Sequence, residues 1–385
     1  TQSRSSAASD VYKRQVPPVS GIYRIGVNGF SEYRLYLDGQ RISSYRGIHL
    51  PILDTREVYL EAGRFYSLRL EYVSKGLDPQ AQLLWSPPGV DYAARALEIA
   101  QKADVVIAVM GLSPALEGEE MPVDVDGFVG GDRTDIGLPE SQEKLLRQLH
   151  ALGKPVVLVL LSGSALAVNW AAEHIPAILE AWYPGEMGGE AIADVLFGDY
   201  NPGGRLPVTF YRSVEDLPPF EDYRMEGRTY RYFKGEPLFP FGYGLSYTTF
   251  ALENLRVAPE GVEAGNEVTV SVDVVNTGPR AGDEVVQLYV HHRDAPGPRP
   301  IKELKGFQRV HLQPGERKTV VFTLHTHQLG LYDDSGRYIV WPGTVDVMVG
   351  HSSRDLPLVG TVEIVGEPTD VARTKVFFSR VRVFG

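Results

Sequence analysis

The sequence predicts a multidomain protein of mixed class, part α/β and part all-β. It begins with a partial β-sandwich, continues as an α/β sandwich with a parallel sheet, and ends in a second β-sandwich. Three observations predict this order. Alternating apolar and polar residues fill the chain before residue 90 and after residue 252, short buried apolar runs alternate with helical periodicity between them, and Gly/Pro turns separate the segments.

Composition limits the function classes. The chain has 385 residues, enough for several domains, and 43% hydrophobic with 23% charged residues is typical of a packed, folded protein. The net charge of −11 argues against nucleic acid as a partner. No apolar run approaches the roughly 18 residues of a membrane span. The absence of cysteine excludes disulfides, zinc–thiolate sites and thiol nucleophiles.

The first two segments differ in character. Residues 1–15 are polar, Ser-rich and aperiodic, without the apolar core of a signal peptide, and we expect a non-native or disordered flank. Residues 16–90 predict an antiparallel sandwich with one buried and one solvated face, in which Asp38-Gly39 forms a hairpin turn. Strands are expected over residues 21–27, 32–37, 56–60, 67–72 and 82–85.

This first sandwich resembles a known sugar-binding domain. The segments G-x-Y-x-I at residues 21–25, L-Y-L-D-G-Q at 35–40 and L-E-A-G-R-F-Y-S-L-R-L-E-Y at 60–72 are similar to the latter half of a protective-antigen-type sandwich. The resemblance implies that the opening strands of the domain lie before Thr1.

Residues 91–213 predict an α/β sandwich. Helix 139–152 is the clearest element, because Leu145, Leu146, Leu149 and Leu152 share one face and Gly153 fits the position after its end. Gly198 similarly ends a helix over 188–197. The other elements expected here are a helix over 92–102 and parallel strands over 104–110, 155–161 and 177–182.

The remaining chain is a connector, a β domain and a tail. Residues 214–251 are rich in Pro, Gly and aromatic residues and predict a connector clamped to its neighbours rather than a free linker. Residues 252–365 predict the C-terminal sandwich, with strands over 268–275, 284–290, 318–324 and 344–349. Residues 366–385 carry no strong pattern and are expected to form a tail.

An acid-rich loop is the most informative chemical feature. Glu117, Glu119 and Glu120 follow the apolar run 104–110 directly, in the loop 111–120. Such a loop lies at the carboxyl edge of an α/β sheet, where these folds bind ligands. Crowded carboxylates can keep one of their number protonated near neutral pH, as a general acid requires. The loop therefore predicts half of an acid/base pair.

Several long motifs, in a fixed order, resemble glycoside hydrolase family 3 over residues 92–365. They are G-L-S-P-x-L-E-G-E at 111–119, G-D-R-x-x-I-x-L-P at 131–139, A-W-Y-P-G-E-x-G-G-x-A at 181–191, G-D-Y-N-P-G-G-R-L-P at 198–207 and P-L-F-P-F-G-Y-G-L-S-Y at 237–247. V-V-N-T-G at 274–278 and E-L-K-G-F at 303–307 resemble the family's fibronectin type III-like end domain. A sugar-binding sandwich just upstream is a known variant of this architecture.

The resemblance implies a retaining, exo-acting β-glycosidase, most often a β-glucosidase or a β-xylosidase, acting on β-linked oligosaccharides or on aryl and alkyl β-glycosides without a cofactor or metal. It implies that Glu117 is the general acid/base; Glu119 is the second candidate, because the register of E-G-E-E can slip by two. The nucleophile is an Asp of an N-terminal (β/α)8 barrel, which we expect before Thr1. The fragment alone is then expected to be inactive.

Other residues have weaker roles. Asp132 and Arg133 are expected to pair and position the long loop, and Trp182 and Tyr183 are expected either to stack on a sugar or to pack beneath the loops. A non-catalytic carbohydrate-binding or adhesion protein stays open as the alternative function. We favour a periplasmic or extracellular location over a cytoplasmic one.

Overall fold

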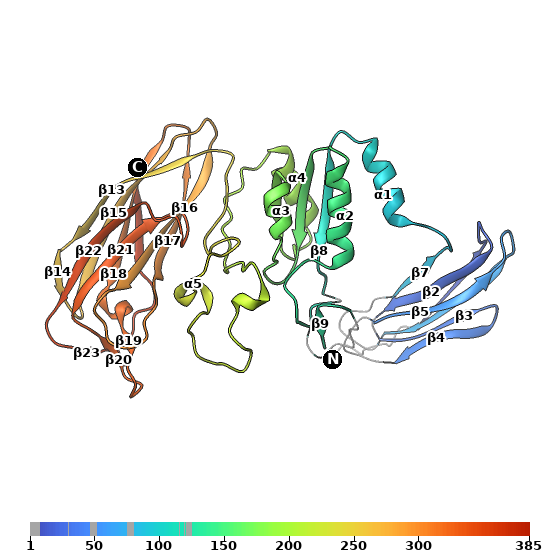
Figure 1. Cartoon of the computed structure of the whole chain (residues 1–385), viewed down its shortest axis with the longest axis horizontal. Helices are drawn as coiled ribbons and strands as arrows, with labels where there is room; N and C mark the ends of the chain where they lie inside the picture. The colour runs from blue at the N-terminus through green and yellow to red at the C-terminus, as the bar shows by residue number, and fades with distance from the viewer. Residues whose placement is uncertain are drawn as a thin grey trace, which may run out of the picture. The chain divides into compact units, whose positions relative to one another are not determined.

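The computed structural model describes residues 8–29, 31–46, 52–74, 81–114, 116–118, 120 and 125–385. The chain divides into two compact units. The first comprises Thr1–Asp135, Pro139–Gly163 and His174–Glu180, and the second Ile136–Leu138, Ser164–Glu173 and Ala181–Gly385. Figure 1 labels the elements of both. None of the described helices is long and apolar enough to cross a membrane.

The first unit opens with the predicted antiparallel β-sandwich. One sheet has the order β1-β6-β3-β4 and the other β5-β2-β7. Tyr23, Ile25 and Val27 lie at alternate positions along β2 and bury their side chains in the core between the sheets. The strands are β1 (Ala8–Gln15), β2 (Gly21–Gly29), β3 (Glu32–Leu37), β4 (Gln40–Arg46), β5 (Ile52–Leu60), β6 (Tyr66–Val73) and β7 (Ala81–Ser86).

The N-terminal flank requires a correction. We expected residues 1–15 to be non-native or disordered, but Ala8–Gln15 forms β1 and pairs antiparallel with β6, from Ala8↔Val73 to Gln15↔Tyr66. Backbone groups make this pairing, so it needs no hydrophobic pattern, and it covers an edge of β6 that would otherwise be open. Residues 1–7 lie outside the described part.

The parallel sheet of the first unit follows. Its order is β12-β11-β8, with Val157 of β11 opposite Ala177 on one side and Ile107 on the other. Helix α2 packs against β8 and α1. The elements are α1 (Tyr92–Gln101), β8 (Val106–Gly111), α2 (Glu140–Ala151), β11 (Val156–Leu161) and β12 (Ala177–Glu180), close to their predicted limits. Strands β8 and β11 therefore end at the same edge.

The second unit begins with helices and the connector. Helix α4 (Gly188–Phe197) ends at Gly198, whose φ of +81° is the left-handed conformation that the sequence predicted there. Most of helix α3 (Asn169–His174), which the sequence analysis did not predict, also belongs to this unit. The connector contains the short helices η1 (Val214–Asp216) and α5 (Thr229–Tyr232).

The C-terminal sandwich confirms the second all-β prediction. Its sheets have the orders β13-β15-β18-β24 and β14-β22-β21-β16-β17, with a small sheet β19-β20-β23 beside them. Val268, Val270, Val272 and Val274 on β15 are fully buried in the core. The strands are β13 (Phe250–Ala258), β14 (Gly261–Glu263), β15 (Glu267–Asn276), β16 (Gly282–His292), β17 (Glu303–Leu312), β18 (Arg317–His325), β19 (Leu331–Tyr332), β20 (Tyr338–Val340), β21 (Gly343–Gly350), β22 (Leu358–Val365), β23 (Thr369–Asp370) and β24 (Arg380–Phe384).

The C-terminal tail also differs from expectation. Residues 366–385 carry no strong sequence pattern and were expected to form a tail, yet β24 pairs antiparallel with β18 from Thr319↔Phe384 to Thr323↔Arg380. Val381 packs against the core of the sandwich. Five residues are too few to produce a recognisable pattern, and the open edge of β18 supplies the hydrogen bonds.

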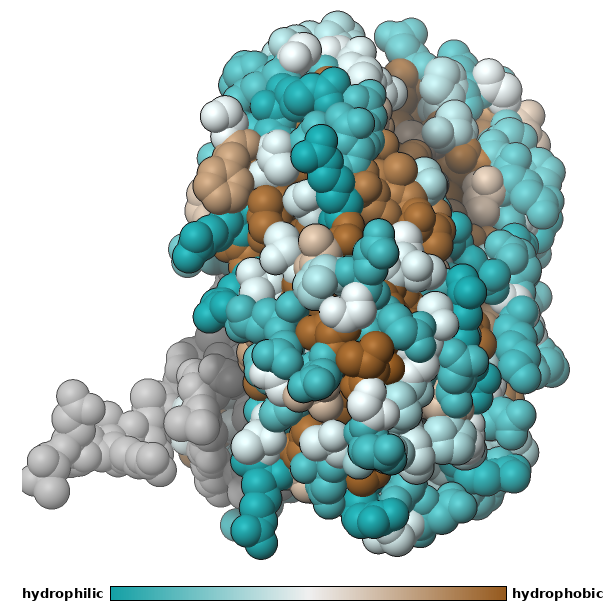
Figure 2. Space-filling view, turned by 90° about the vertical axis from the view of Figure 1, so that its left-hand side faces the viewer, coloured by the Kyte–Doolittle hydropathy of each residue, from teal (hydrophilic) through white to brown (hydrophobic). Residues whose placement is uncertain are grey.

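The surface of this sandwich is mixed in character. Figure 2, viewed from the side of the C-terminal sandwich, shows apolar areas interspersed in a mostly hydrophilic surface. Val359 of β22 is exposed and, with Leu255 and Val257 of β13, lines a shallow groove. Scattered apolar side chains of this kind are normal on protein surfaces and indicate no partner by themselves.

A clamp joins Arg205, shortly before the connector, and Gly242 within the connector to the C-terminal sandwich. The guanidinium of Arg205 donates to the carboxylate of Glu284 at 2.9 Å, and Nδ1 of His351 lies 3.1 Å from the same carboxylate. Side chains of Arg205 and Glu284 are only 9% and 3% exposed. Gln287 Nε2 adds hydrogen bonds to the carbonyls of Gly242 and His351. The motifs at 198–207 and 237–247 therefore have a structural role at this junction.

This clamp predicts a pH dependence of stability. Burial alone would lower the pKa of His351, but the hydrogen bond and charge of Glu284 outweigh it and raise the pKa above the ordinary 6.5. Between pH 6.5 and the raised pKa, His351 therefore keeps its proton in the folded state and has released it in the unfolded state. The stabilisation is complete below pH 6.5 and is lost as pH rises through the folded pKa. Urea unfolding measures the free energy of unfolding of the chain and of His351→Gln across this pH range. The difference between the two values should become smaller as the pH rises.

His292 provides a control of opposite sign. Burial lowers the pKa of His292, against the opposing hydrogen bond to the carbonyl of Trp341. Its contribution is therefore present above pH 6.5 and is lost as pH falls through the folded pKa. For each variant, the loss in free energy of unfolding relative to the parent chain can be plotted against pH. Equal slopes of these plots for His351→Gln and His292→Gln would contradict this account.

Candidate active site

The acid-rich loop is rooted firmly at the end of β8. Leu112 N–H donates to the carbonyl of Leu161 at 2.6 Å, and a Cβ on Gly111 would meet this same oxygen at 2.0 Å. The side-chain amide of Gln142 on α2 both accepts from Gly111 N–H at 2.7 Å and donates to Gly111 C=O at 2.8 Å. The starting point of the loop is thus fixed by β11 and by α2.

Glu117 lies at the carboxyl edge of the sheet, where the sequence predicted the acid. Its backbone N–H donates to Ser113 C=O at 3.0 Å and forms a tight turn. Its half-buried side chain accepts a hydrogen bond from Gly163 N–H at 2.8 Å, through Oε2. Gly163 follows the end of β11, so the carboxylate of Glu117 joins the ends of two neighbouring parallel strands.

The other carboxylates of the cluster differ. Glu119, the second candidate, lies outside the described residues. Glu120 is exposed and has a φ of +49°, the left-handed conformation that non-glycine residues seldom adopt. Within the described part of the loop, Glu117 is the carboxylate held against the sheet edge, while its role as acid/base stays a prediction.

The loop continues into a small hairpin. Strands β9 (Phe128–Val129) and β10 (Asp132–Arg133) pair, with Asp132 opposite Val129 and Arg133 opposite Phe128. The guanidinium Nε of Arg133 donates to the carbonyl of Asp135 at 3.0 Å, whereas Asp132 is exposed. The side chain of Arg133 therefore stabilises the end of the hairpin through a hydrogen bond to a backbone carbonyl. The expected pairing of Asp132 with Arg133 stays a prediction.

Gly131 connects this hairpin to the acid turn. Its φ is +91°, and a Cβ at this position would lie 2.0 Å from the carbonyl oxygen of Gly118, the neighbour of Glu117. A side chain cannot be accommodated without moving one of the two segments. Gly130 provides a comparison, because its φ is +62° and a Cβ there would meet nothing within 4 Å.

Gly131→Ala is expected to displace the turn that carries Glu117. For the glycosidase activity that the resemblance implies, with Glu117 as acid/base, we expect Gly131→Ala to lower kcat/KM on an alkyl β-glycoside about tenfold or more, since misplacement of a catalytic group by about 1 Å can cost 10²-fold. Gly130→Ala bears a similar backbone strain without the clash and should stay within about twofold of the parent. Steady-state kinetics of both variants measure the difference, and equal losses would contradict a role for the close contact.

Trp182 and Tyr183 belong to the second unit, whereas Glu117, Asp132 and Arg133 belong to the first. Trp182 is half-buried, has a φ of +54°, and makes an edge contact with Phe210 at 5.9 Å between ring centroids. Tyr183 is 37% exposed. The packing of Trp182 accounts for part of its environment, and its left-handed backbone is a strain often found at functional sites. Sugar stacking by this pair stays a prediction.

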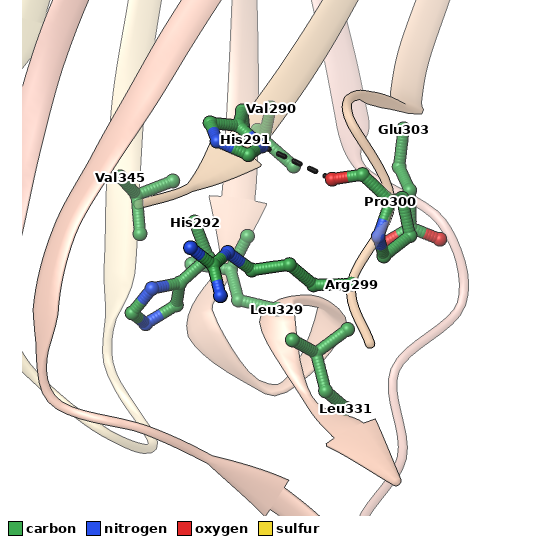
Figure 3. Close-up of a pocket in the computed structure, with 9 residues that line it drawn as sticks. All are labelled: Val290, His291, His292, Arg299, Pro300, Glu303, Leu329, Leu331 and Val345. Atoms are coloured by element: carbon green, nitrogen blue, oxygen red, sulfur yellow. Dashed lines mark hydrogen bonds between the residues drawn. The ribbon is translucent and has the colours of Figure 1, made fainter. Parts of the chain in front are cut away.

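Histidines of the C-terminal sandwich form a cavity with a structural role (Figure 3). His291 Nδ1–H donates to Pro300 C=O, and His292 Nε2–H donates to Trp341 C=O while its Nδ1 accepts from Ala295 N–H. Arg299 donates to two backbone carbonyls nearby. Among the described residues, no group of three or more His, Asp or Glu is arranged to hold a metal ion.

The sequence analysis did not identify the partners of Glu117. Gly163, in the pair Ser162-Gly163, was not singled out from the sequence, yet its N–H is the donor to the Glu117 carboxylate. The position of this pair, directly after a predicted strand parallel to 104–110, was the available signal. Gln142 carried no signal, because its amide contacts backbone 31 residues away in sequence.

Comparisons with known proteins identify the family. The "Glycosyl hydrolase family 3 C-terminal domain" matches residues 6–247, and the "Fibronectin type III-like domain" matches residues 284–353. A xylan 1,4-beta-xylosidase of Xylanibacter ruminicola is 40% identical over 349 residues, which cover 88% of this chain and 39% of that protein. A periplasmic beta-glucosidase of Salmonella typhimurium is 37% identical over 361 residues, covering 91% of this chain and 43% of that protein.

Comparison with solved structures supports the same family. A beta-glucosidase from Kluyveromyces marxianus in complex with glucose superimposes with a TM-score of 0.76 at 32% identity, covering 94% of this chain and 45% of that one. The chain thus spans about two fifths of the length of the relatives it matches. The family match covers more than half of the chain in one continuous range, and the order of its motifs and domains is the family's order. The chain therefore belongs to glycoside hydrolase family 3.

Proposed function

We propose that this chain is the C-terminal part of a retaining exo-β-glycosidase that removes terminal non-reducing β-D-glucosyl or β-D-xylosyl residues, and that Glu117 is its general acid/base. The observation that carries the proposal is the position of the Glu117 carboxylate, held at the carboxyl edge of the parallel sheet by Gly163 N–H at 2.8 Å. The names of the relatives, beta-glucosidase and xylan 1,4-beta-xylosidase, support this substrate class.

The chemistry requires a second carboxylate. In the first step, a nucleophilic carboxylate forms a bond to the anomeric carbon while Glu117 gives its proton to the leaving glycosidic oxygen. In the second step, Glu117 takes a proton from water, whose oxygen displaces the carboxylate and releases the sugar with retained configuration. The two carboxyl groups of such enzymes lie roughly 5–5.5 Å apart. We assign the nucleophile to an Asp of a (β/α)8 barrel outside these 385 residues.

The exposure of apolar side chains on β8 supports the proposal that a further part of the protein covers this strand. It is the edge strand of the three-stranded sheet, and Ile107 and Val109 on it are 47% and 57% exposed. Parallel sheets are normally covered on both faces and carry apolar residues for that reason. The limited share of each relative that the chain covers, between 39% and 45%, is consistent with a preceding catalytic domain.

Two further features belong to this proposal. The first sandwich, with its core of Tyr23, Ile25 and Tyr33, is proposed to be of the protective-antigen sugar-binding type and to contact the glycan beyond the terminal residue. The location proposed for the enzyme is periplasmic or extracellular, in keeping with the Salmonella typhimurium relative named as periplasmic.

Activity assays test the proposal. The 385-residue chain alone should show no turnover of aryl β-D-glucosides or aryl β-D-xylosides, whereas the same chain joined to the product of the coding region upstream should hydrolyse at least one of them. Turnover by the chain alone would contradict the divided active site. If the joined protein binds oligosaccharide without hydrolysing it, the non-catalytic alternative is correct.

A further inference from the structure

A small cavity lies between the connector and the C-terminal sandwich, within the second unit. Thr209, Lys302, Ser353 and Arg354 are its polar lining residues, and Tyr230 belongs to its apolar walls. The free space admits roughly one water-sized sphere, too little for a sugar or a phosphate. None of the described residues that line it carries a carboxylate.

Thr209 contributes a hydroxyl that requires explanation. The residue is 7% exposed, and its Oγ1 has no hydrogen-bond partner among the residues that the structure describes. A buried hydroxyl left unpaired is destabilising, so such groups in proteins usually have a partner. An acceptor in the cavity would satisfy the O–H of Thr209.

Two cations line the cavity, of which Lys302 is partly buried and Arg354 is exposed. Lys302 Nζ donates to the carbonyl of Ser353 at 2.6 Å, which leaves donor capacity on its ammonium group. Arg354 donates to the carbonyl of Gly235, and its ion pair with Glu236 is long, at 3.9 Å. The side chain of Glu236 is 73% exposed, where solvent screens its charge. Burial, together with the charge of Arg354, lowers the pKa of Lys302, as expected for a cation short of counter-charge.

We propose that this cavity is a binding site for a single halide ion, chloride in solution, held by Lys302, Arg354 and the hydroxyl of Thr209. A water molecule would fit the space and accept from Thr209, but it would leave the partly buried charge of Lys302 uncompensated. A monatomic anion accepts from the hydroxyl and compensates that charge at once. The ion connects the connector to the C-terminal sandwich and stabilises this junction. The site is independent of the glycosidase proposal.

Thermal unfolding of the 385-residue chain tests the site. At equal ionic strength, chloride and bromide should raise Tm above the value in gluconate, which is too large for the cavity. Lys302→Met should abolish this difference, while Lys144→Met, at an exposed lysine of α2, should retain it. Thr209→Val, which preserves the shape of the side chain, should raise the halide concentration for half of the Tm shift about tenfold, as loss of one charge-assisted hydrogen bond predicts.

Bromide gives a direct test that does not depend on the stability of a variant. Crystals of the chain grown in bromide should show an anomalous peak between Thr209 Oγ1, Lys302 Nζ and the Arg354 guanidinium. Water density without an anomalous peak would overturn the proposal, as would an unchanged difference between chloride and gluconate in Lys302→Met. These readouts involve no glycosidase activity, so failure here leaves the proposed function intact.

Discussion

Replacing Glu117 by alanine in the proposed glycosidase is expected to lower kcat/KM on alkyl β-glycosides by about 10²–10⁴-fold, the usual contribution of a general acid. An alkoxide is a poor leaving group and needs the proton that we propose Glu117 supplies. A dinitrophenyl β-glycoside has an acidic leaving group and needs none, so its kcat/KM should change far less. Steady-state kinetics over a series of leaving groups should give a steeper dependence on leaving-group pKa in the variant.

Azide provides a second readout of the same substitution. Without a general base, water attacks the covalent intermediate slowly, whereas azide is already anionic and needs no deprotonation. Azide should therefore raise the turnover of the dinitrophenyl substrate by Glu117→Ala and yield a β-glycosyl azide of retained configuration. NMR of the product identifies the anomer.

Two further variants make the assignment specific. Glu98→Ala removes an exposed carboxylate of α1 that pairs with Lys102 on the surface, and it should behave as the parent enzyme. Glu119→Ala tests the alternative register of the acid cluster. If Glu119→Ala shows azide rescue and leaving-group dependence while Glu117→Ala does not, the acid/base is two residues further along the chain.

The second large effect is expected at the buried clamp of the connector. Glu284→Ala should lower the free energy of unfolding of the second unit by about 3–5 kcal/mol, because it leaves the guanidinium of Arg205 buried without its partner. Burial would raise the pKa of Glu284, but the hydrogen bond from His351 and the charge of Arg205 outweigh it and lower the pKa. Urea unfolding followed by tryptophan fluorescence measures the loss at neutral pH, where this carboxyl is ionised.

A surface pair provides the matched control. Glu253 pairs with Arg317 at 2.8 Å in the same unit, with both side chains close to half exposed. Glu253→Ala should leave stability nearly unchanged, since solvent screens such pairs. The double variant Arg205→Leu/Glu284→Leu should lose less than the sum of the two single variants, because it leaves no unpaired buried charge. Equal losses for Glu284→Ala and Glu253→Ala would contradict the clamp.

Elements with strong periodicity could be predicted from the sequence. Helix α2 and strand β11 lie within one residue of the expected limits, because an apolar face or a continuous apolar run reports burial directly. Helix α3 and strands β1 and β24 were missed or left as flank and tail. They are short or polar, and β1 and β24 are held by backbone hydrogen bonds to the edges of β6 and β18, which leave no trace in side-chain pattern.

The candidate site could also be predicted only in part from the sequence. That an acid-rich loop follows a buried strand could be recognised from residues 104–120, and the family motifs indicated Glu117. The donor to the Glu117 carboxylate could not be recognised from the sequence, because Gly163 is 46 residues away in the chain. The cavity at Thr209, Lys302 and Arg354 could not be recognised either, because it gathers residues from four separate segments.

The sequence by itself determined the order of the domains, the family and the loop that carries the candidate acid, because these depend on local periodicity and on contiguous motifs. Only the tertiary structure decided which backbone N–H holds Glu117, which side chains clamp the connector and where two cations share a cavity with a buried hydroxyl. Hydrogen bonds and buried charges of this kind act over a few ångströms in space and connect residues that no spacing along the chain relates.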